Sequence, residues 1–358
     1  MPSLKEIKGR INSISSTLAI TSAMKMVASA KLQKAQMAIQ NMLPYERRLY
    51  SMLLDLMGAM NISAAASEDG SVRGSGSAER GFDQSGDRLS LSNRHDLAGM
   101  DGAYSLMAQR EVRKVAIVAF ASNSSLCGAF NSNVIREATA VINEYRASGL
   151  RDSDIVVYSV GRKMAEAMRK LGFPSPADFT KMSDSPSYEA ASALAQELLD
   201  GFVSGRFDKV ELVYNHYKST SSQPTTRQTY LPLSLADATA DIQVGKITDP
   251  ASETDTNRVA EPVGAPVVRQ GSPTTEDLIV EPSKEALIAT LLPKVVRLRI
   301  FTTLLDSAAA EHAARTVAMQ LATDSGNDLL QELTLEYNKG RQQKITSEIL
   351  DLVGGSMQ

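Results

Sequence analysis

Cysteine and tryptophan are almost missing from this chain of 358 residues, which has one Cys, no Trp and 5% aromatic residues. The single thiol, Cys127, excludes an intramolecular disulfide, a CxxC redox pair and a cysteine-based zinc cluster, and it fits a reducing compartment. Few aromatic and many aliphatic residues favour helix-on-helix packing over a β-sandwich or a barrel. The length predicts about two domains.

Long apolar runs and a positive charge excess are also absent. No stretch reaches the roughly 18 apolar residues of a membrane span. The N-terminus has neither the apolar core of a secretion signal nor the Arg-rich pattern of an organelle import signal. We therefore expect membrane association only through partners. The net charge of −3 argues against nucleic-acid binding.

The motifs of nucleotide, metal and hydrolytic sites are missing too. There is no GxxxxGKS/T phosphate loop, no GxGxxG after a strand, no HExxH, and no GxSxG between a strand and a helix. We predict no catalytic residue, no cofactor and no metal. Two alternatives stay open: a small-molecule site in the loop around Cys127, which follows a predicted strand, and an anion site at Gly161-Arg-Lys163, which opens a predicted helix.

The first 43 residues carry a sustained heptad pattern, in which ten of twelve seam positions are apolar. The seam reads Leu4, Ile7, Ile11, Ile14, Leu18, Thr21, Lys25, Ala28, Leu32, Ala35, Ile39 and Met42. Such a seam indicates a coiled coil. The helical pattern resumes after Pro44, for a total span of roughly 80 Å. Six basic residues against the single acid Glu6 indicate either an acidic partner surface or a solvated helix face.

A second long helix is predicted from Lys284 to Val353, interrupted only by Pro293, Gly326 and Gly340. A proline near a helix start is tolerated with a kink, and each glycine costs about 1 kcal/mol relative to alanine. Two such helices at opposite ends of the chain need each other as partners, either parallel or antiparallel. The middle segment then has to return the chain close to its starting point.

The middle of the chain predicts an α/β domain. Strands are expected at Val115–Phe120, Ile155–Val160 and Lys209–Asn215, with a possible fourth at Thr229–Leu233. Helices are expected from the first strand's loop to about Arg146, at Arg162–Leu171 and at Tyr188–Val203. This alternation indicates parallel βαβ units that are Rossmann-like in topology only.

Composition divides the chain into five segments. They are an N-terminal helix at 1–63, a Ser/Gly-rich insertion at 64–105, the α/β domain at 106–234, an acidic insertion at 235–281 and a C-terminal helix at 282–358. Neither insertion can bury enough apolar surface to fold well alone. We expect that residues 70–95 can be deleted without loss of assembly.

Three stretches resemble one family of proteins. They are Ile20-Thr-Ser-Ala-Met-Lys-Met-Val-Ala-Ser-Ala-Lys31, the turn Ser125-Leu-Cys-Gly-Ala-Phe-Asn131, and the long run from Glu311-His-Ala-Ala-Arg315 through Tyr337-Asn-Lys-Gly-Arg-Gln-Gln-Lys-Ile-Thr346 to Leu350. All three are similar to signatures of the gamma subunits of F-type ATP synthases, of a bacterial type with two insertions. The resemblance covers most of the chain outside the insertions.

The resemblance implies a fold and a role. The fold is α/β plus a long antiparallel coiled coil, in which the N- and C-terminal helices form a shaft beside the central Rossmann-like domain. The role is that of the non-catalytic rotor subunit that transmits torque from an ion-driven membrane ring to a catalytic ring. The implied partners are the alpha and beta subunits of the catalytic hexamer, the epsilon subunit and the ring of c subunits. The implied location is peripheral, on the cytoplasmic face of the bacterial inner membrane.

The resemblance also implies contact residues. Met24 and Lys25 match the segment that faces the lever loop of the catalytic subunit, and Arg341, Gln342 and Thr346 match positions that meet its catch loops. We expect Lys25 to be an exposed break in the seam, and Ile14 to pack against residues 337–349. Ser125, Ala129 and Phe130 depart from the family's turn, and one cysteine cannot form the regulatory dithiol of some photosynthetic members.

Two rival functions remain open. One is a coiled-coil adaptor whose α/β domain binds a small molecule, which ligand-dependent thermal stabilisation of the chain would support. The other is an α/β enzyme with long oligomerising helices, which turnover by the purified chain would support.

Overall fold

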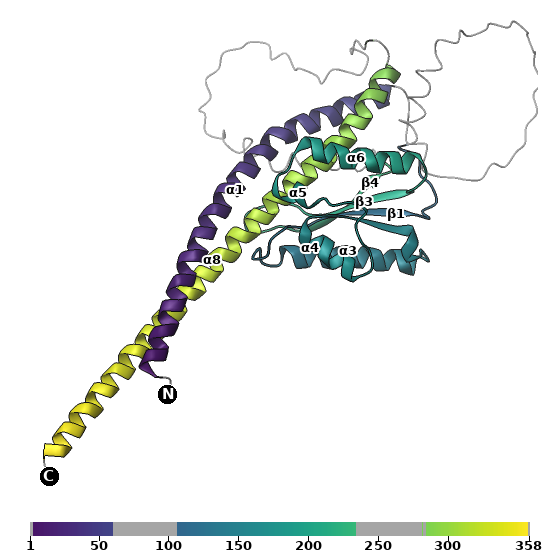
Figure 1. The fold of residues 1–358 in the computed structure, drawn as a ribbon. Coiled ribbons are helices and arrows are strands. Elements are labelled where there is room, and N and C mark those ends of the chain that lie inside the picture. Colours follow the sequence, from purple (N-terminus) through teal and green to yellow (C-terminus); the bar gives the residue numbers. More distant parts are fainter. Residues whose placement is uncertain (1–2, 60–105, 234–280, 282–283, 357–358) are drawn as a thin grey trace, which may run out of the picture.

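The computed structural model describes residues 3–59, 106–233, 281 and 284–356 (Figure 1). Apart from Glu281, both predicted insertions lie outside these residues. The expectation about deleting residues 70–95 also concerns that part of the chain.

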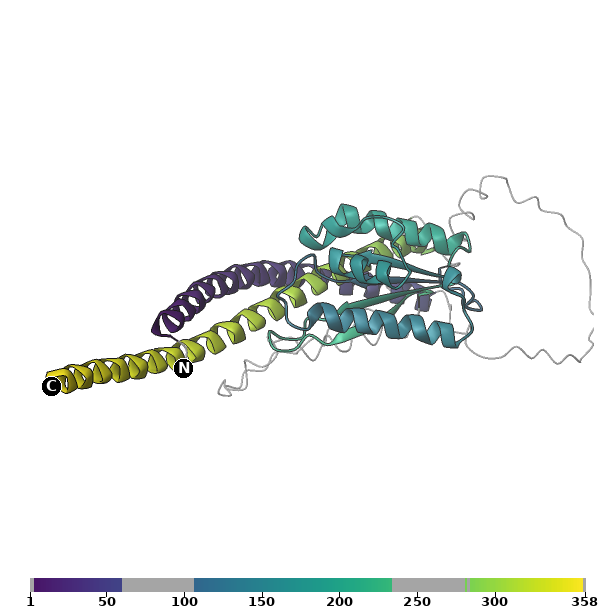
Figure 2. The ribbon, with the colours of Figure 1, turned by 60° about the horizontal axis from the view of Figure 1, so that its bottom comes forward.

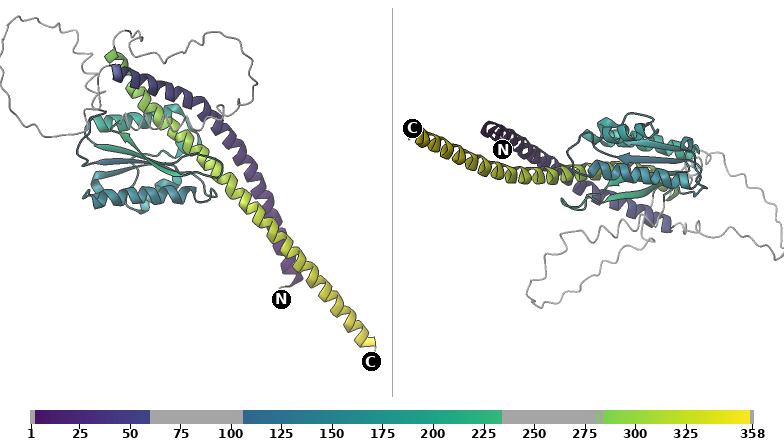
Figure 3. Two further views of the ribbon diagram at one scale, coloured as in Figure 1. Left: turned by 180° about the vertical axis from the view of Figure 1, so that it is seen from behind. Right: turned by 90° about the horizontal axis from the view of Figure 1, so that it is seen from below.

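Two long helices dominate the molecule. Helix α1 spans Leu4–Ala59 and helix α8 spans Lys284–Ser356. They run antiparallel, side by side, and the C-terminal end of α8 projects beyond the N-terminus (Figures 1 and 3). At 1.5 Å per residue, α8 is about 110 Å long and α1 about 84 Å. We call this helix pair the shaft; the antiparallel pairing confirms the predicted fold.

The predicted heptad seam is visible in the burial of α1. Side chains at the seam positions from Leu4 to Leu32 are buried or half-buried, while most of those between them are exposed. On α8 the half-buried positions Thr323, Gly326, Leu330, Leu333, Tyr337 and Gly340 continue the same 3–4 spacing. Helix α1 continues through Pro44, in agreement with the single N-terminal helical segment expected from the sequence.

The register of the two helices contradicts one prediction. A methyl group added at Gly340 would lie 3.2 Å from Leu4 Cδ2, and one added at Gly326 would lie 2.7 Å from Leu18 Cδ2. Ile14 lies between Leu4 and Leu18 on α1, so it faces the stretch of α8 between Gly326 and Gly340. The expectation that Ile14 packs against residues 337–349 is therefore wrong, because the family signature gives no axial register.

The central domain is a four-stranded sheet in the order β2-β1-β3-β4. Strands β1 (Val115–Phe120), β2 (Ile155–Val160) and β3 (Lys209–Asn215) are parallel, as predicted. Strand β4 (Thr225–Leu231) is antiparallel to β3 and begins before the predicted Thr229. The short connection at 216–224 explains its direction, because a parallel crossover needs a dozen or more residues.

Helices cover both faces of this sheet (Figures 1 and 2). Helices α3 (Phe130–Ala147) and α4 (Arg162–Lys170) pack on one face. Helix α6 (Tyr188–Val203), the first half of α8 and the end of α1 pack on the other. The remaining helices, η2 (Asp152–Asp154) and α5 (Thr180–Asp184), are short. The shaft is therefore part of the core of the α/β domain and not an appendage to it.

Candidate functional site

The carboxyl ends of β1 and β3 meet the shaft at one junction. The chain leaves β1 toward β2 on one side and later returns to β3 on the other side, so this is the point of the sheet where strand order reverses. Doubly wound sheets commonly bind ligands in the crevice at such a point. Here α8 lies over it: Cys127, Phe130 and Ala310 form one buried apolar cluster, against which Tyr217 and Ala314 pack.

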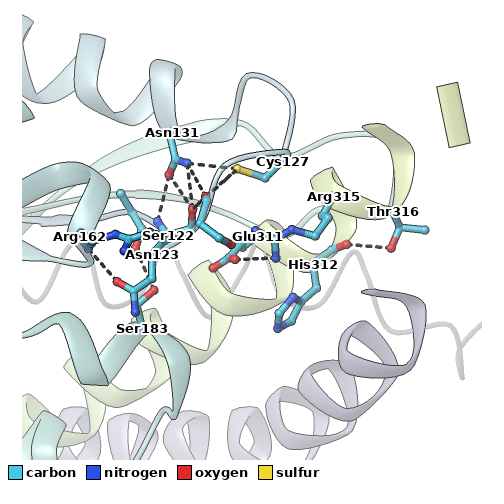
Figure 4. A network of polar contacts seen from close by, with 12 residues as sticks. Ser122, Asn123, Cys127, Asn131, Arg162, Ser183, Glu311, His312, Arg315 and Thr316 are labelled. Atoms are coloured by element: carbon cyan, nitrogen blue, oxygen red, sulfur yellow. Dashed lines mark hydrogen bonds and ion pairs between the residues drawn. The ribbon is translucent and has the colours of Figure 1, made fainter. Parts of the chain in front are cut away.

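Polar contacts fix both strand ends to α8. After β3, the backbone N–H of Tyr217 donates to Asp306 Oδ1 at 2.9 Å, and His216 Nδ1 lies 2.7 Å from Asp306 Oδ2. After β1, Arg315 Nη2 donates to Ser124 Oγ at 2.6 Å (Figure 4). One carboxylate and one guanidinium of α8 thus hold the two loops that would otherwise border a ligand crevice.

The turn between β1 and α3 is closed by its own hydrogen bonds. The N–H of Ser122 donates to Asn131 Oδ1 at 3.0 Å, and Asn131 Nδ2 donates to the Ser124 carbonyl at 3.2 Å (Figure 4). Gly128 lies against Ala318 of α8 and has φ +58°. The turn therefore comes closest to the shaft at a residue whose left-handed backbone favours glycine. The departure at Phe130 fits this environment, because its ring is buried against α8.

A buried ionic pair lies beneath this turn. Glu311 is buried and pairs with Arg315 at 2.8 Å. Burial raises the pKa of Glu311, against the opposing effect of Arg315. Burial, with the charges of Arg315 and Lys31, lowers the pKa of His312 to about 4, so this imidazole is neutral at neutral pH. Within the described residues, His312 Nδ1 is buried without a hydrogen-bond partner.

Two further observations concern the ligand sites left open by the sequence. A small cavity between the carboxyl ends of β1 and β2 and α8, lined by residues including Ser183, Ser307 and Glu311, has about 10 Å³, enough for about one water and far below a metabolite site. At the start of α4, Asn123 Oδ1 accepts from the N–H of Arg162 at 2.7 Å, which an anion would otherwise receive. No group of acidic, His or Cys residues within the described ranges could hold a metal ion.

The structure places the predicted contact residues in two separate groups. Met24 is exposed, whereas Lys25 lies half-buried in the seam between Thr21 and Ala28. The expectation of a fully exposed Lys25 is therefore wrong; a lysine stem can pack against a helix while its ammonium stays in water. Arg341, Gln342 and Thr346 are exposed on the part of α8 that projects beyond α1. Since Thr21 lies against Thr323, the two groups are about 35 Å apart along the shaft.

Sequence reasoning missed the side chains that make the shaft unusual as a surface. The shaft exposes many large apolar residues away from the α/β domain, which we call the distal apolar set: Ile20, Met24, Met26 and Val27 on α1, and Leu321, Leu329, Leu335, Ile345, Ile349, Leu350, Leu352 and Val353 on α8. A concentration of exposed large apolar side chains in one part of a protein is typical of an interaction site. The sequence offered one indication of this surface, because Leu335 and Ile349 are apolar but fall outside the seam positions of α8.

No helix in the described part of the chain has a segment apolar enough, over sufficient length, to cross a membrane.

Comparison with known proteins agrees with this geometry. A family model described as ATP synthase matches residues 3–357. The ATP synthase gamma chain of Phocaeicola vulgatus is 47% identical over 357 residues, with 100% of both chains covered, and that of Bacteroides thetaiotaomicron is 44% identical with the same coverage.

Among solved structures, a chain of the mitochondrial ATP synthase of Euglena gracilis (OSCP/F1/c-ring, rotational state 3) has a similar fold. Its TM-score is 0.52 at 17% identity, covering 99% of this chain and 93% of that one. Matching sequence over the full length and matching architecture together place this chain in the family of ATP synthase gamma chains.

Proposed function

We propose that this chain is the central-stalk rotor subunit of an F-type ATP synthase, and that it transmits torque between an ion-driven membrane ring and a catalytic nucleotide-binding ring. The observation that carries the proposal is the distal apolar set, which covers a long helix pair with side chains that need a surrounding partner. The chain is a non-catalytic subunit, and nucleotide chemistry belongs to its partners.

Two surfaces of the shaft would meet the catalytic ring. The first is the face of α1 around Met24, where Ile20 and Val27 are also exposed, together with the half-buried Lys25. The second is the end of α8 beyond α1, with Arg341, Gln342 and Thr346. Arg341 offers a planar fork of donors and Lys25 a point charge, so each suits carboxylates or carbonyls of the partner.

The mechanism follows from the unequal shape of the shaft. The part of the shaft farthest from the α/β domain is α8 alone (Figure 3). The rest of the shaft is the pair of α1 and α8, whose faces differ. A rotating body of this shape makes different contacts with each surrounding catalytic subunit at any one angle. Different contact free energies shift the open and closed populations of each subunit, which couples rotation to nucleotide binding and release. ATP hydrolysis would drive the same steps in reverse and pump ions.

The remaining partners would bind the other end of the molecule. The α/β domain and the lower shaft are proposed to face the epsilon subunit and the ring of c subunits, with the alpha and beta subunits around the distal shaft. The chain would be peripheral on the cytoplasmic face of the bacterial inner membrane. The curated relatives named above are bacterial proteins, which supports this location.

Substitutions in the part of α8 that projects beyond α1 test the proposal. Ile345→Ser with Ile349→Ser removes two exposed apolar side chains, whereas Lys344→Ser with Glu348→Ser removes two exposed charged ones from the same turns. Both pairs are expected to change the stability of the isolated chain only slightly, because all four side chains are exposed. We expect only the first pair to reduce co-purification of the chain with hexameric ATPase subunits and ATP-driven ion pumping. Equal effects, or no co-purification of the unsubstituted chain, would refute the proposed role.

A further inference from the structure

The part of the shaft farthest from the α/β domain is paired through glycine on one helix and leucine on the other. Gly326 of α8 faces Leu18 of α1 so closely that an added methyl group would lie 2.7 Å from Leu18 Cδ2 and 3.1 Å from Cγ. At Gly340 the same methyl would lie 3.2 Å from Leu4 Cδ2. A methyl group at 2.7 Å would force Leu18 to move, and one at 3.2 Å would lie closer to Leu4 than most real contacts, so each leucine packs more closely against glycine than it could against a larger residue.

A pair of hydroxyl groups lies next to the first of these contacts. Thr323 Oγ1 is 3.1 Å from Thr21 Oγ1, and the Thr21 hydroxyl donates to the Leu18 carbonyl at 3.1 Å. This threonine pair links the two helices at a seam position where the neighbouring positions are mostly apolar. A single polar pair in a coiled-coil seam commonly fixes which residues face each other.

All three contacts belong to a single register. The step of fourteen residues from Leu4 to Leu18 on α1 matches the fourteen from Gly340 to Gly326 on α8, and the step from Leu18 to Thr21 matches that from Gly326 to Thr323. Between the glycines, α8 presents the larger Leu330, Leu333 and Tyr337 to the seam. A shift of one heptad would keep an apolar seam but would bring Leu18 against Leu333 or Met319 and separate the threonines.

We infer that Leu18 with Gly326, supported by Thr21 with Thr323, sets the axial register of the distal shaft. Aliphatic seams tolerate a heptad shift because one leucine resembles the next, whereas a leucine that fits only against glycine does not. These residues are positioning residues: none of them is proposed to touch a partner.

The register matters because the two proposed partner surfaces lie on different helices. Met24 belongs to α1 and Arg341 belongs to α8, so the distance between them is not fixed by the geometry of a single helix. Their separation is therefore determined by how the helices pair. A shift by one heptad would change it by about 10 Å. This functional half of the inference rests on the proposed torque-transmitting role; the register itself does not.

The test exchanges the two residues. Gly326→Leu alone places two leucines in one space, whereas Gly326→Leu combined with Leu18→Gly restores one leucine and one glycine with the same total volume. Gly9→Leu is the matched control, because an added side chain at exposed Gly9 would meet nothing within 4 Å. Spin labels at Ser13→Cys and Gln331→Cys, both exposed and at one level of the shaft, report the register; the one native cysteine is buried.

The inference predicts three results for the full chain and its complex. The distance distribution between labels lengthens or broadens in Gly326→Leu, because a full heptad displaces the two labels axially by about 10 Å from their common level; it returns to the original value in the exchanged pair and does not change in Gly9→Leu. In the assembled complex, ion pumping per ATP hydrolysed falls in Gly326→Leu and recovers in the exchanged pair. Circular dichroism confirms that each variant is helical.

Three results would overturn the inference. The first is an unchanged distance distribution in Gly326→Leu, and the second is failure of the exchanged pair to restore it in a helical chain. The third is a changed register with unchanged pumping, which would remove its functional half while leaving the rotor role intact. A complex of the unsubstituted chain that hydrolyses ATP but never pumps would instead refute the proposed function, without affecting the label distances.

Discussion

Removal of the buried carboxylate Glu211 should make the α/β domain unfold far more easily. Glu211 is 2% exposed at its side chain and lies between Lys209 Nζ at 2.6 Å and Arg227 Nε at 2.7 Å. The Tyr145 hydroxyl from α3 donates to its Oε1 at 2.7 Å. One carboxylate therefore ties β3, β4 and α3 together.

The size of the effect follows from this burial. Glu211→Gln keeps the shape of the side chain but leaves Lys209 and Arg227 close together without their shared anion. Breaking a buried ion pair on one side costs about 3–5 kcal/mol. With a urea m-value of about 2–3 kcal/mol/M, the unfolding midpoint of the domain should fall by about 1–2 M. The near-ultraviolet circular dichroism of the tyrosines, most of which lie in this domain, reports its unfolding.

The pH dependence gives an independent check. Burial alone raises a carboxyl pKa, but hydrogen bonds from Arg227, Lys209 and Tyr145 hold the pKa of Glu211 below its ordinary value. A carboxyl group with a lowered pKa contributes stability above its unfolded pKa, and this contribution is lost as the pH falls through the folded value. The difference in unfolding free energy between the original chain and Glu211→Gln should therefore shrink below about pH 4.5.

A double replacement tests whether the loss in Glu211→Gln comes from leaving the charged partners without their anion. Glu211→Leu combined with Arg227→Leu removes both members of the Glu211–Arg227 pair and should recover much of the loss, because apolar replacements of buried ion pairs are often neutral. A loss below about 1 kcal/mol in Glu211→Gln, or one that does not depend on pH, would refute the reasoning. It would mean that solvent reaches this carboxylate.

Three further outcomes are expected. Lys25→Glu in the assembled complex should reduce ion pumping more than ATP hydrolysis; a parallel loss of both, with loss of assembled complex, would make Lys25 purely structural. Gly161→Ala should prevent normal folding of the α/β domain by circular dichroism, because its methyl would lie 2.1 Å from the Ala121 carbonyl oxygen at φ +96°; a native spectrum would contradict this. Stability of the original chain should fall as the pH drops from about 6.5 toward 4, since unfolded His312 takes up a proton that folded His312 refuses; the slope should be smaller in His312→Gln, and an equal slope would exclude this histidine.

The shaft was largely predictable because its signal is local. The heptad seam that starts at Leu4 requires a helical partner, and the sequence contains one other helical segment of comparable length. The axial register was not predictable in the same way. It depends on which leucine meets which glycine across the pair, and Leu18 and Gly326 are separated by most of the chain.

The α/β domain shows the same limit. Strands β1, β2 and β3 are buried apolar runs that stand out in sequence. Strand β4 begins with Thr225-Thr-Arg-Gln-Thr229 and lies half-buried at an edge, so its polar half was missed and only its end was placed. The half-burial of Lys25 and the distal apolar set likewise depend on how two helices face each other, which no single segment encodes.

The position of α8 over the carboxyl ends of β1 and β3 has a consequence for how the α/β domain is held. In other doubly wound sheets this crevice receives a diffusible molecule, whose occupancy varies with its concentration. Here the occupant belongs to the same polypeptide, so its effective concentration is constant and dilution cannot remove it. The Asp306 contacts and the apolar cluster of Cys127, Phe130 and Ala310 hold the domain at this point, beside the larger core that α8 shares with the sheet. Its attachment here therefore does not depend on the concentration of a diffusible molecule.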